Sequence, residues 1–193
     1  MMKRDECLKA LAKHHSDEIV VATYAAAFEW IVIKPSPLNY ISPGAMGQAS
    51  SHALGFALGR PDKRVLVLDG DGSLLMNLSS LATIANAAPP NLIHFVCENG
   101  CYEINGGHPI PGQGRLSFAG MAKAAGYRSV HEFDELADFE ERIADVLREE
   151  GPVLVDLKVE QGEVYPRDFN QVHGPNMRVE FAAALKASNP PAS

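Results

Sequence analysis

The chain lacks several features that mark common classes of protein. It has three cysteines in 193 residues, too few for a disulfide framework, and none of them forms a CxxC pair of the kind that binds zinc. Such cysteine usage is simplest to explain in a reducing cytoplasm. No run of about 18 apolar residues is present to span a membrane, and no apolar segment follows the basic start to form a signal peptide.

Basic residues are also in the minority. Lys and Arg number 17 against 24 Asp and Glu, which gives a net charge of −7, and no basic stripe is present to neutralise phosphates. A general nucleic-acid-binding role is therefore not expected. Hydrophobic residues make up 46% and charged residues 21%, as in an ordinary globular protein. With no linker or internal repeat in the sequence, we expect residues 1–193 to form a single domain.

Apolar runs of strand length alternate with helical patterns along the chain. Val65–Leu68 and Leu92–Val96 are continuous apolar strands of the kind buried on both faces of a parallel sheet. The alternation predicts an α/β fold with a doubly wound, mostly parallel sheet and helices on both faces. Segment 24–33 is apolar and ambiguous. The expected strands are 19–23, 65–68, 92–96, 127–130 and 153–159, the expected helices 8–12, 47–58, 78–87, 116–125, 134–149 and 178–186, and the expected long loops 99–115 and 160–175.

Two loops at the carboxyl ends of these strands carry polar residues that suit a metal site. Asp71 follows the strand at 65–68, and Asn99 follows the strand at 92–96, 28 residues after Asp71. Because neighbouring parallel strands end at one edge of a sheet, we expect both side chains to reach the same place. A carboxylate and an amide oxygen suit Mg²⁺, which binds few protein groups and lets phosphate oxygens complete its octahedron.

The glycines of the first loop suit an anion beside that metal. Gly70 and Gly72 let the backbone approach a phosphate closely, and the helix expected after Ser73 offers unpaired N–H groups to a diphosphate. A tight turn is the simpler explanation of an isolated GDG, but the strand before it and Asn99 after it favour the metal and phosphate site. A calcium loop fails because Leu74 stands where glycine is needed, and no GxGxxG follows a strand to indicate a dinucleotide site.

This pairing resembles the thiamine diphosphate motif, which opens with GDG and closes with an Asn-rich turn on the next strand. The resemblance covers roughly residues 19–187, and the stretch 43–86 is most similar to the small subunits of sulfopyruvate decarboxylase and the C-terminal part of phosphonopyruvate decarboxylase. It implies the thiamine diphosphate-binding fold, with thiamine diphosphate and Mg²⁺ as cofactors. By position, it implies that the side chains of Asp71 and Asn99 and the backbone carbonyl of Cys101 bind the Mg²⁺.

The resemblance also implies which residues bind the rest of the cofactor. Gly72, Ser73 and the Ile104 amide would hold the diphosphate. Met46 matches the bulky residue that supports the bent conformation of the cofactor, although ordinary core packing also explains a methionine there. The full set of cofactor-binding residues expected on this basis is Gly44, Met46, Gly70, Asp71, Gly72, Ser73, Asn99, Cys101, Tyr102, Glu103 and Ile104.

The activity implied by the resemblance is decarboxylation of a small 2-oxoacid to an aldehyde and CO₂, with the cofactor as electron sink. Members of the family activate the cofactor with a glutamate on a separate pyrimidine-binding domain, and no part of this sequence resembles that domain. We therefore expect a separate alpha subunit that supplies the activating glutamate. The expected assembly is a hetero-oligomer or a dimer of two diphosphate-binding domains. Carboligation, as in acetolactate synthase, and cofactor binding without catalysis stay open as alternatives. An oxidoreductase β-subunit is disfavoured because its iron–sulfur cysteine ligands are missing.

The sequence departs from the family where a substrate would be recognised. Residues 23–30 are largely apolar and carry no cation, whereas sulfopyruvate and phosphonopyruvate decarboxylases tend to have a polar pair after the first strand. His108 stands beside two glycines where the family often has Gln. We interpret His108 and Arg167 as candidate catalytic or substrate-side groups, with a solvated loop charge as the alternative for Arg167. The identity of the 2-oxoacid stays open.

Overall fold

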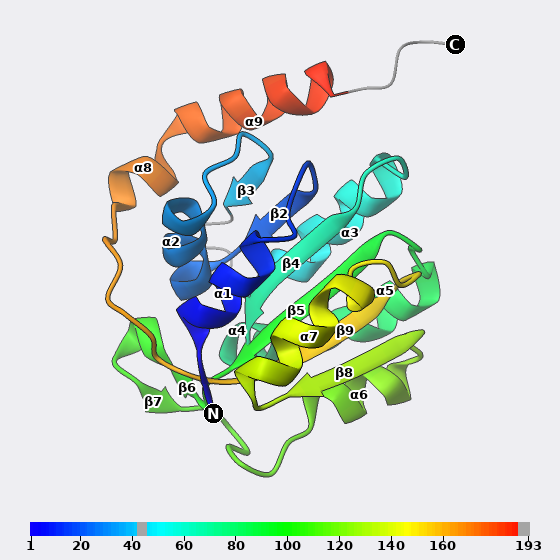
Figure 1. The fold of residues 1–193 in the computed structure, drawn as a ribbon, viewed down its shortest axis with the longest axis vertical. Helices are drawn as coiled ribbons and strands as arrows, with labels where there is room; N and C mark the ends of the chain where they lie inside the picture. Colours follow the sequence, from blue (N-terminus) through cyan, green and yellow to red (C-terminus); the bar gives the residue numbers. More distant parts are fainter. Residues whose placement is uncertain (42–45, 189–193) are drawn as a thin grey trace.

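A parallel β-sheet forms the middle layer of the molecule, which a computed structural model describes for residues 1–41 and 46–188 (Figure 1). Within these residues seven strands lie in one sheet, and every neighbouring pair is parallel. The doubly wound, mostly parallel fold expected from the sequence is confirmed. The strand order is β1 (Met2–Lys3), β9 (Val153–Glu160), β5 (Leu92–Glu98), β4 (Val65–Gly70), β2 (Ile19–Ala22) and β3 (Asn39–Ile41), and β8 (Ser129–Phe133) also pairs with β9.

Helices cover both faces of this sheet (Figure 1). The near face in this view carries α1 (Arg4–Ala12), α2 (Tyr24–Ile33) and α7 (Leu136–Val146), and the far face carries α3 (Ala49–Gly59), α5 (Ser80–Ala87) and α6 (Phe118–Ala125). The short helix α4 (Asp71–Met76) follows β4, and the described chain ends with α8 (Phe169–His173) and α9 (Pro175–Ala187). Among the described residues, no helix combines the length and the apolar character needed to cross a membrane.

Side chains of the strands alternate between two hydrophobic cores, one on each face of the sheet. Leu66 and Leu68 of β4 belong to the core that includes α1, α2 and α7, whereas Val65 and Val67 belong to the core that includes α3, α5 and α6. Burial on both faces explains why these strands are continuous apolar runs. The same alternation fixes the register of the strands, so the polar residues that follow β4 and β5 reach one edge of the sheet.

The structure corrects the expected boundaries in several places. The strand expected at 127–130 begins at Ser129, because Tyr127 still closes the end of α6 by donating its N–H to the carbonyl oxygen of Ala122. The ambiguous segment 24–33 is the helix α2. The sequence does not predict β1 and β3, because runs of two and three residues show no periodicity and depend on pairing with β9 and β2. The loops expected at 99–115 and 160–175 contain a short hairpin and α8, respectively.

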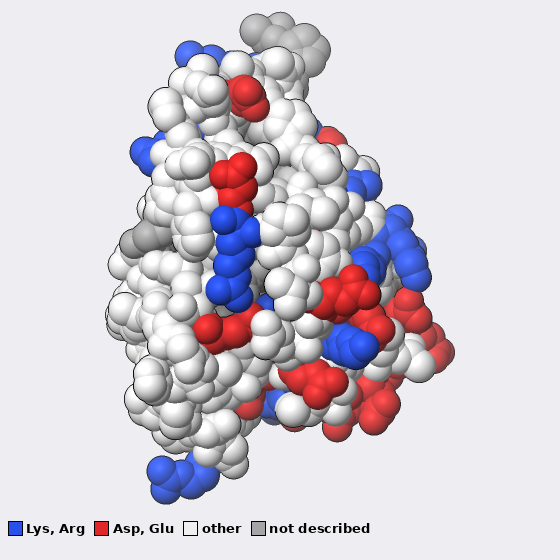
Figure 2. All heavy atoms as spheres, turned by 90° about the vertical axis from the view of Figure 1, so that its left-hand side faces the viewer, with Lys and Arg blue, Asp and Glu red and all other residues white. Residues whose placement is uncertain are grey.

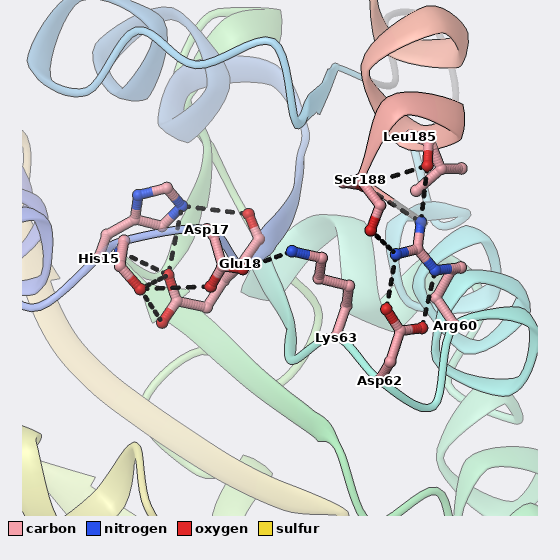
Figure 3. A network of polar contacts seen from close by, with 9 residues as sticks. His15, Asp17, Glu18, Arg60, Asp62, Lys63, Leu185 and Ser188 are labelled. Carbon is pink, nitrogen blue, oxygen red and sulfur yellow. Dashed lines mark hydrogen bonds and ion pairs between the residues drawn. The ribbon is translucent and has the colours of Figure 1, made fainter. Parts of the chain in front are cut away.

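Arg60 fixes the C-terminal end of α9 to the loop that follows α3 (Figure 3). Its guanidinium donates to the carbonyl oxygens of Leu185 and Ser188, both at 2.8 Å, and pairs with the carboxylate of Asp62 at 2.6 Å. The last carbonyl groups of a helix have no partner within it, and the negative end of the helix dipole attracts a cation. Arg60 therefore stabilises the docked position of α9.

We expect Arg60→Ala to lower the free energy of unfolding by about 1–2 kcal/mol, because the protein loses hydrogen bonds from a charged donor whose side chain is only 10% exposed. Urea denaturation of the full chain measures this loss. Arg148→Ala is the control, because Arg148 forms a solvent-exposed ion pair with Asp145. This variant should leave the unfolding midpoint unchanged. Equal shifts for the two variants would show that Arg60 is merely another surface charge.

Candidate functional site

One cavity at the carboxyl edge of the sheet collects the ends of β2, β4 and β5, the position at which open α/β sheets bind ligands. In Figure 1 this edge lies at the lower left, near α4 and the hairpin of β6 (Cys101–Tyr102) and β7 (His108–Pro109). Gly44 lies outside the described residues. Every other residue expected to bind the cofactor lines this cavity: Met46, Gly70, Asp71, Gly72, Ser73, Asn99, Cys101, Tyr102, Glu103 and Ile104.

Asp71 joins the two loops that build the cavity. It is 1% exposed, and its carboxylate accepts hydrogen bonds from the backbone N–H groups of Gly72 and Gly100, both at 2.7 Å. Burial raises the pKa of Asp71 to about 6, and the nearby negative charge of Glu98 acts in the same direction, while the backbone N–H groups of Gly100, Gly72 and Asn99 lower it. The carboxylate has about four lone pairs, more than its backbone donors occupy, so Asp71 offers a buried, preformed ligand for a cation.

Asn99 stands beside Gly100 and lines the same cavity as Asp71. Its Oδ1 accepts a hydrogen bond from the Cys101 N–H at 2.9 Å, and its Nδ2 donates to Glu103 Oε2 at 3.2 Å. Both ends of the side-chain amide are therefore engaged, while Oδ1 keeps a second lone pair. The structure thus brings together the two side chains that the sequence placed on consecutive strands.

Gly72 and Ser73 pack the start of α4 against neighbouring loops. A Cβ atom on Gly72 would lie 2.6 Å from the ring of Tyr102, so only glycine allows the hairpin to approach this closely. Ser73 Oγ accepts a hydrogen bond from the Gly47 N–H at 2.9 Å. This contact holds Gly47 in place. Its neighbour Met46 is half-buried and lines the cavity. Three separate chain segments therefore meet at one wall of the site.

The segment after β2 forms another part of the wall and carries backbone strain. Tyr24 has a φ of +47°, a conformation that is rare for a residue with a large side chain, and it lines the cavity together with Thr23, Ala25 and Ala26. Strain of this kind persists only where surrounding structure enforces it, and it is frequent at functional sites. The segment in which the sequence departs from the family therefore faces the site.

The two candidate substrate-side residues differ in position. Arg167 lines a second cavity, which adjoins the first and shares Asn99 and Glu103 with it. Its guanidinium lies 3.7 Å from the Glu103 carboxylate, and its side chain is 41% exposed. His108 is exposed on β7 and is not among the described residues that line either cavity. Arg167 thus lines a cavity that adjoins the site, whereas His108 lines neither cavity, although its neighbours Gly106 and Gly107 line the second one.

Sequence reasoning missed Arg4, a charged residue that lines the cavity. Arg4 at the start of α1 lines the cavity, is 3% exposed, and forms ion pairs with Glu29 and Glu103, both at 2.6 Å. These partners lie 25 and 99 positions away, so no local pattern links them. The only hint in the sequence is Glu29, a charged residue inside the otherwise apolar segment that became α2.

The donor set fits a Mg²⁺ ion that is completed by a diphosphate. Within 1–41 and 46–188, no group of three or more His, Cys, Asp or Glu side chains could hold a metal ion. Asp71 and Asn99 supply two hard oxygen ligands, the small number that Mg²⁺ takes when phosphate oxygens bind it as well. Burial, with the nearby charge of Asp71, raises the pKa of the Cys101 thiol, which favours its backbone carbonyl over a thiolate as ligand.

The chain belongs to the thiamine pyrophosphate enzymes: residues 21–157 match the family of the thiamine pyrophosphate enzyme C-terminal TPP binding domain. This finding confirms both the resemblance noted in the sequence and thiamine diphosphate as the cofactor. Phosphonopyruvate decarboxylase from Streptomyces viridochromogenes is 37% identical over 157 residues, which are 81% of this chain and 39% of that protein. Sulfopyruvate decarboxylase subunit beta from Methanothermobacter thermautotrophicus is 34% identical over 163 residues, 84% of either chain.

The solved structures agree with this fold. Benzoylformate decarboxylase from Polynucleobacter necessarius superposes with a TM-score of 0.68 at 21% sequence identity, over 86% of this chain and 34% of that one. This chain therefore spans about a third of the length of these phosphonopyruvate and benzoylformate decarboxylases, but most of the length of the beta subunit.

Proposed function

We propose that this chain is the diphosphate-binding subunit of a two-chain, thiamine diphosphate- and Mg²⁺-dependent decarboxylase, which converts a small 2-oxoacid to an aldehyde and CO₂. The observation that carries the proposal is the cavity shared by the ends of β4 and β5, where the N–H of Gly100 binds the carboxylate of Asp71. The similarity to a sulfopyruvate decarboxylase beta subunit along most of its length supports the two-chain form. We further propose that residues 1–193 act as a single domain and work in the cytoplasm.

In this proposal the chain holds the charged end of the cofactor. Asp71, Asn99 and the Cys101 carbonyl bind Mg²⁺, and the metal together with backbone groups of Gly70, Gly72, Tyr102, Glu103 and Ile104 and the Ser73 side chain neutralises the diphosphate. Gly44 and Met46 support the middle of the cofactor. When bound, thiamine diphosphate supplies the electron sink for loss of CO₂. The residues of this chain bind and orient it.

A surface without charge supports docking of a pyrimidine-binding alpha subunit, which would supply the activating glutamate. Helices α3 and α5 contain no Lys, Arg, Asp or Glu, and Leu58 and Met76 are 58% and 59% exposed. On the side of the molecule that Figure 2 shows, charged side chains gather toward the face of the sheet that carries α1 and α7, and the part toward the opposite face is largely uncharged. Interfaces are depleted of charge at their centres and enriched in such apolar residues.

The proposed substrate is a small 2-oxoacid related to sulfopyruvate. Two of the relatives are named for phosphonopyruvate and sulfopyruvate, which both carry a second acidic group. In the described part of this chain the wall from Thr23 to Ala26 is uncharged, so we assign recognition of that group to Arg167 beside the adjoining cavity. His108 would contribute only if a partner chain covers β7.

Co-purification with a pyrimidine-domain chain, followed by a panel of 2-oxoacids, tests the proposal. We expect a stable complex that releases CO₂ and an aldehyde from at least one small 2-oxoacid, and a complex with Asp71→Ala that releases none. A product with a new carbon–carbon bond would establish carboligation instead. Cofactor binding with no turnover of any 2-oxoacid in the complex would establish a non-catalytic module.

The buried Asp71 carboxylate predicts a pH dependence of metal binding. Because burial raises its pKa to about 6 and Mg²⁺ binds the ionised form, protons compete with the metal as the pH falls through that value. The apparent Mg²⁺ affinity should be constant above about pH 7 and should fall by about tenfold per pH unit below about pH 6. Titration of thiamine diphosphate binding with Mg²⁺ at several pH values measures this; an unchanged affinity down to about pH 5 would contradict it.

A further inference from the structure

A buried path of polar side chains connects α1 and α2 to the cofactor cavity. Arg4 Nε and Nη2 donate to the two carboxylate oxygens of Glu29 at 3.0 and 2.6 Å. Arg4 Nη1 donates to Glu103 Oε2 at 2.6 Å, and the same oxygen accepts a hydrogen bond from Asn99 Nδ2 at 3.2 Å. Four side chains from α1, α2 and the loop after β5 thus form one continuous set of hydrogen bonds that ends on Asn99.

The path fixes which way the Asn99 amide faces. Its oxygen accepts from the Cys101 N–H at 2.9 Å, and its nitrogen donates to the Glu103 carboxylate. If the amide turned over, its NH₂ group would meet the Cys101 N–H and its oxygen would meet a negative carboxylate, so both contacts would become repulsive. Glu103 therefore holds Oδ1, the atom with a lone pair for a metal, in a single orientation.

Arg4 and Glu29 hold Glu103 in turn. The guanidinium of Arg4 makes two hydrogen bonds to Glu29, which is 3% exposed. Its Nη1 and Nη2 also donate to Oε2 and Oε1 of Glu103, at 2.6 and 3.3 Å. The side chain of Glu103 is only 12% exposed, and Arg4 offsets its negative charge close to the cavity. Arg167 approaches the other oxygen, Oε1, from the second cavity at 3.7 Å. Both carboxylate oxygens are thus committed to protein groups.

We propose that Glu103 is a positioning residue that orients Asn99 toward the metal, and that Arg4 and Glu29 hold Glu103 in place. The inference rests on the proposed Mg²⁺ site at Asp71 and Asn99. The backbone and the side chain of Glu103 then have different roles. The backbone belongs to the cofactor site, whereas the carboxylate affects the metal only by orienting Asn99. Partners that orient metal ligands in this way typically change metal affinity by 10–100-fold when they are removed.

The test is the Mg²⁺ concentration that gives half-maximal thiamine diphosphate binding, measured by calorimetry on the full chain. Glu103→Ala should raise it by about tenfold or more, because the amide is released. Glu103→Gln should raise it by less than about threefold, since its carbonyl oxygen can still accept from Asn99. Asp156→Asn is the matched control: Asp156 is a fully buried acid on β9 that lies outside this network and does not line the cavity, so its replacement should shift the thermal midpoint and leave the Mg²⁺ requirement unchanged.

An unchanged Mg²⁺ requirement for Glu103→Ala, equal to that of Asp156→Asn, would overturn the proposal, because the network would then be structural only. If Glu103→Ala does not fold, Arg4→Lys decides the question: lysine keeps the charge but cannot bridge both carboxylates, so a raised Mg²⁺ requirement supports the proposal and an unchanged one overturns it. Asp71→Asn is measured alongside. If it also binds Mg²⁺ normally, the metal site itself is wrong, whereas an effect of Asp71→Asn without an effect at Glu103 refutes the positioning role alone.

Discussion

Replacing Asp71 with asparagine is expected to weaken Mg²⁺-dependent binding of thiamine diphosphate by more than about 100-fold, the upper end of the loss seen when only an orienting partner is removed. The substitution preserves volume but removes the negative charge that attracts the metal. It also turns an NH₂ donor toward one of the N–H groups of Gly72 and Gly100, which both donate to the carboxylate at 2.7 Å. Calorimetry of the full chain with cofactor and Mg²⁺ measures the loss.

Asp156→Asn is the matched control for this experiment. Asp156 is another fully buried aspartate, on β9, whose pKa burial raises to about 7, but it does not line the cofactor cavity. Its replacement should shift the thermal midpoint and leave cofactor affinity within about twofold of wild type, as expected for separate sites. Equal losses in the two variants, or an unchanged affinity in Asp71→Asn, would remove Asp71 from the metal site.

Gly72→Ala is expected to weaken cofactor binding by more than about tenfold. The protein should still fold, because overpacking of this kind costs only about 1–3 kcal/mol of stability. The added methyl group would lie 2.6 Å from the Tyr102 ring and 3.3 Å from Ile110. Tyr102 lines the cavity, so its displacement changes the shape of the wall that faces the diphosphate. Cofactor titration and thermal unfolding of the same sample separate the two effects.

Gly55→Ala provides the comparison for Gly72→Ala. Gly55 is a helical glycine in α3, and a Cβ atom there has nothing within 4 Å. This substitution should leave cofactor affinity unchanged and raise stability by about 0.5–1 kcal/mol, the helix-propensity difference between glycine and alanine. If Gly72→Ala binds the cofactor as well as Gly55→Ala does, the close contact with Tyr102 has no bearing on the site.

The parts of the site that lie within one strand–helix–strand unit could be predicted from the sequence. Asp71 and Asn99 each follow a buried apolar strand, and the geometry of parallel strands carries both residues to one edge. The fold class follows from the same alternation of patterns. These features depend on local periodicity and on a connection of fixed hand, which a sequence displays directly.

The parts that depend on distant contacts could not be predicted. Arg4 reaches Glu103 across 99 positions, and a charged residue near the start of a chain ordinarily suggests a solvated terminus. The hairpin of β6 and β7 lies inside a glycine-rich segment, and its two-residue strands show no strand pattern in the sequence. Gly106 and Gly107, both with positive φ, form its turn. His108 is exposed on β7 and does not line the cavity, whereas Ile110 directly after β7 returns to the site and donates its N–H to the carbonyl oxygen of Gly100.

A crystal structure of the chain with thiamine diphosphate and Mn²⁺ in place of Mg²⁺ tests the central claim most directly, since the anomalous scattering of Mn²⁺ locates the metal. We predict one peak at about 2.0–2.2 Å from an Asp71 carboxylate oxygen, Asn99 Oδ1, the Cys101 carbonyl oxygen and diphosphate oxygens. A metal peak elsewhere, or a diphosphate bound away from the loops that follow β4 and β5, would contradict the account.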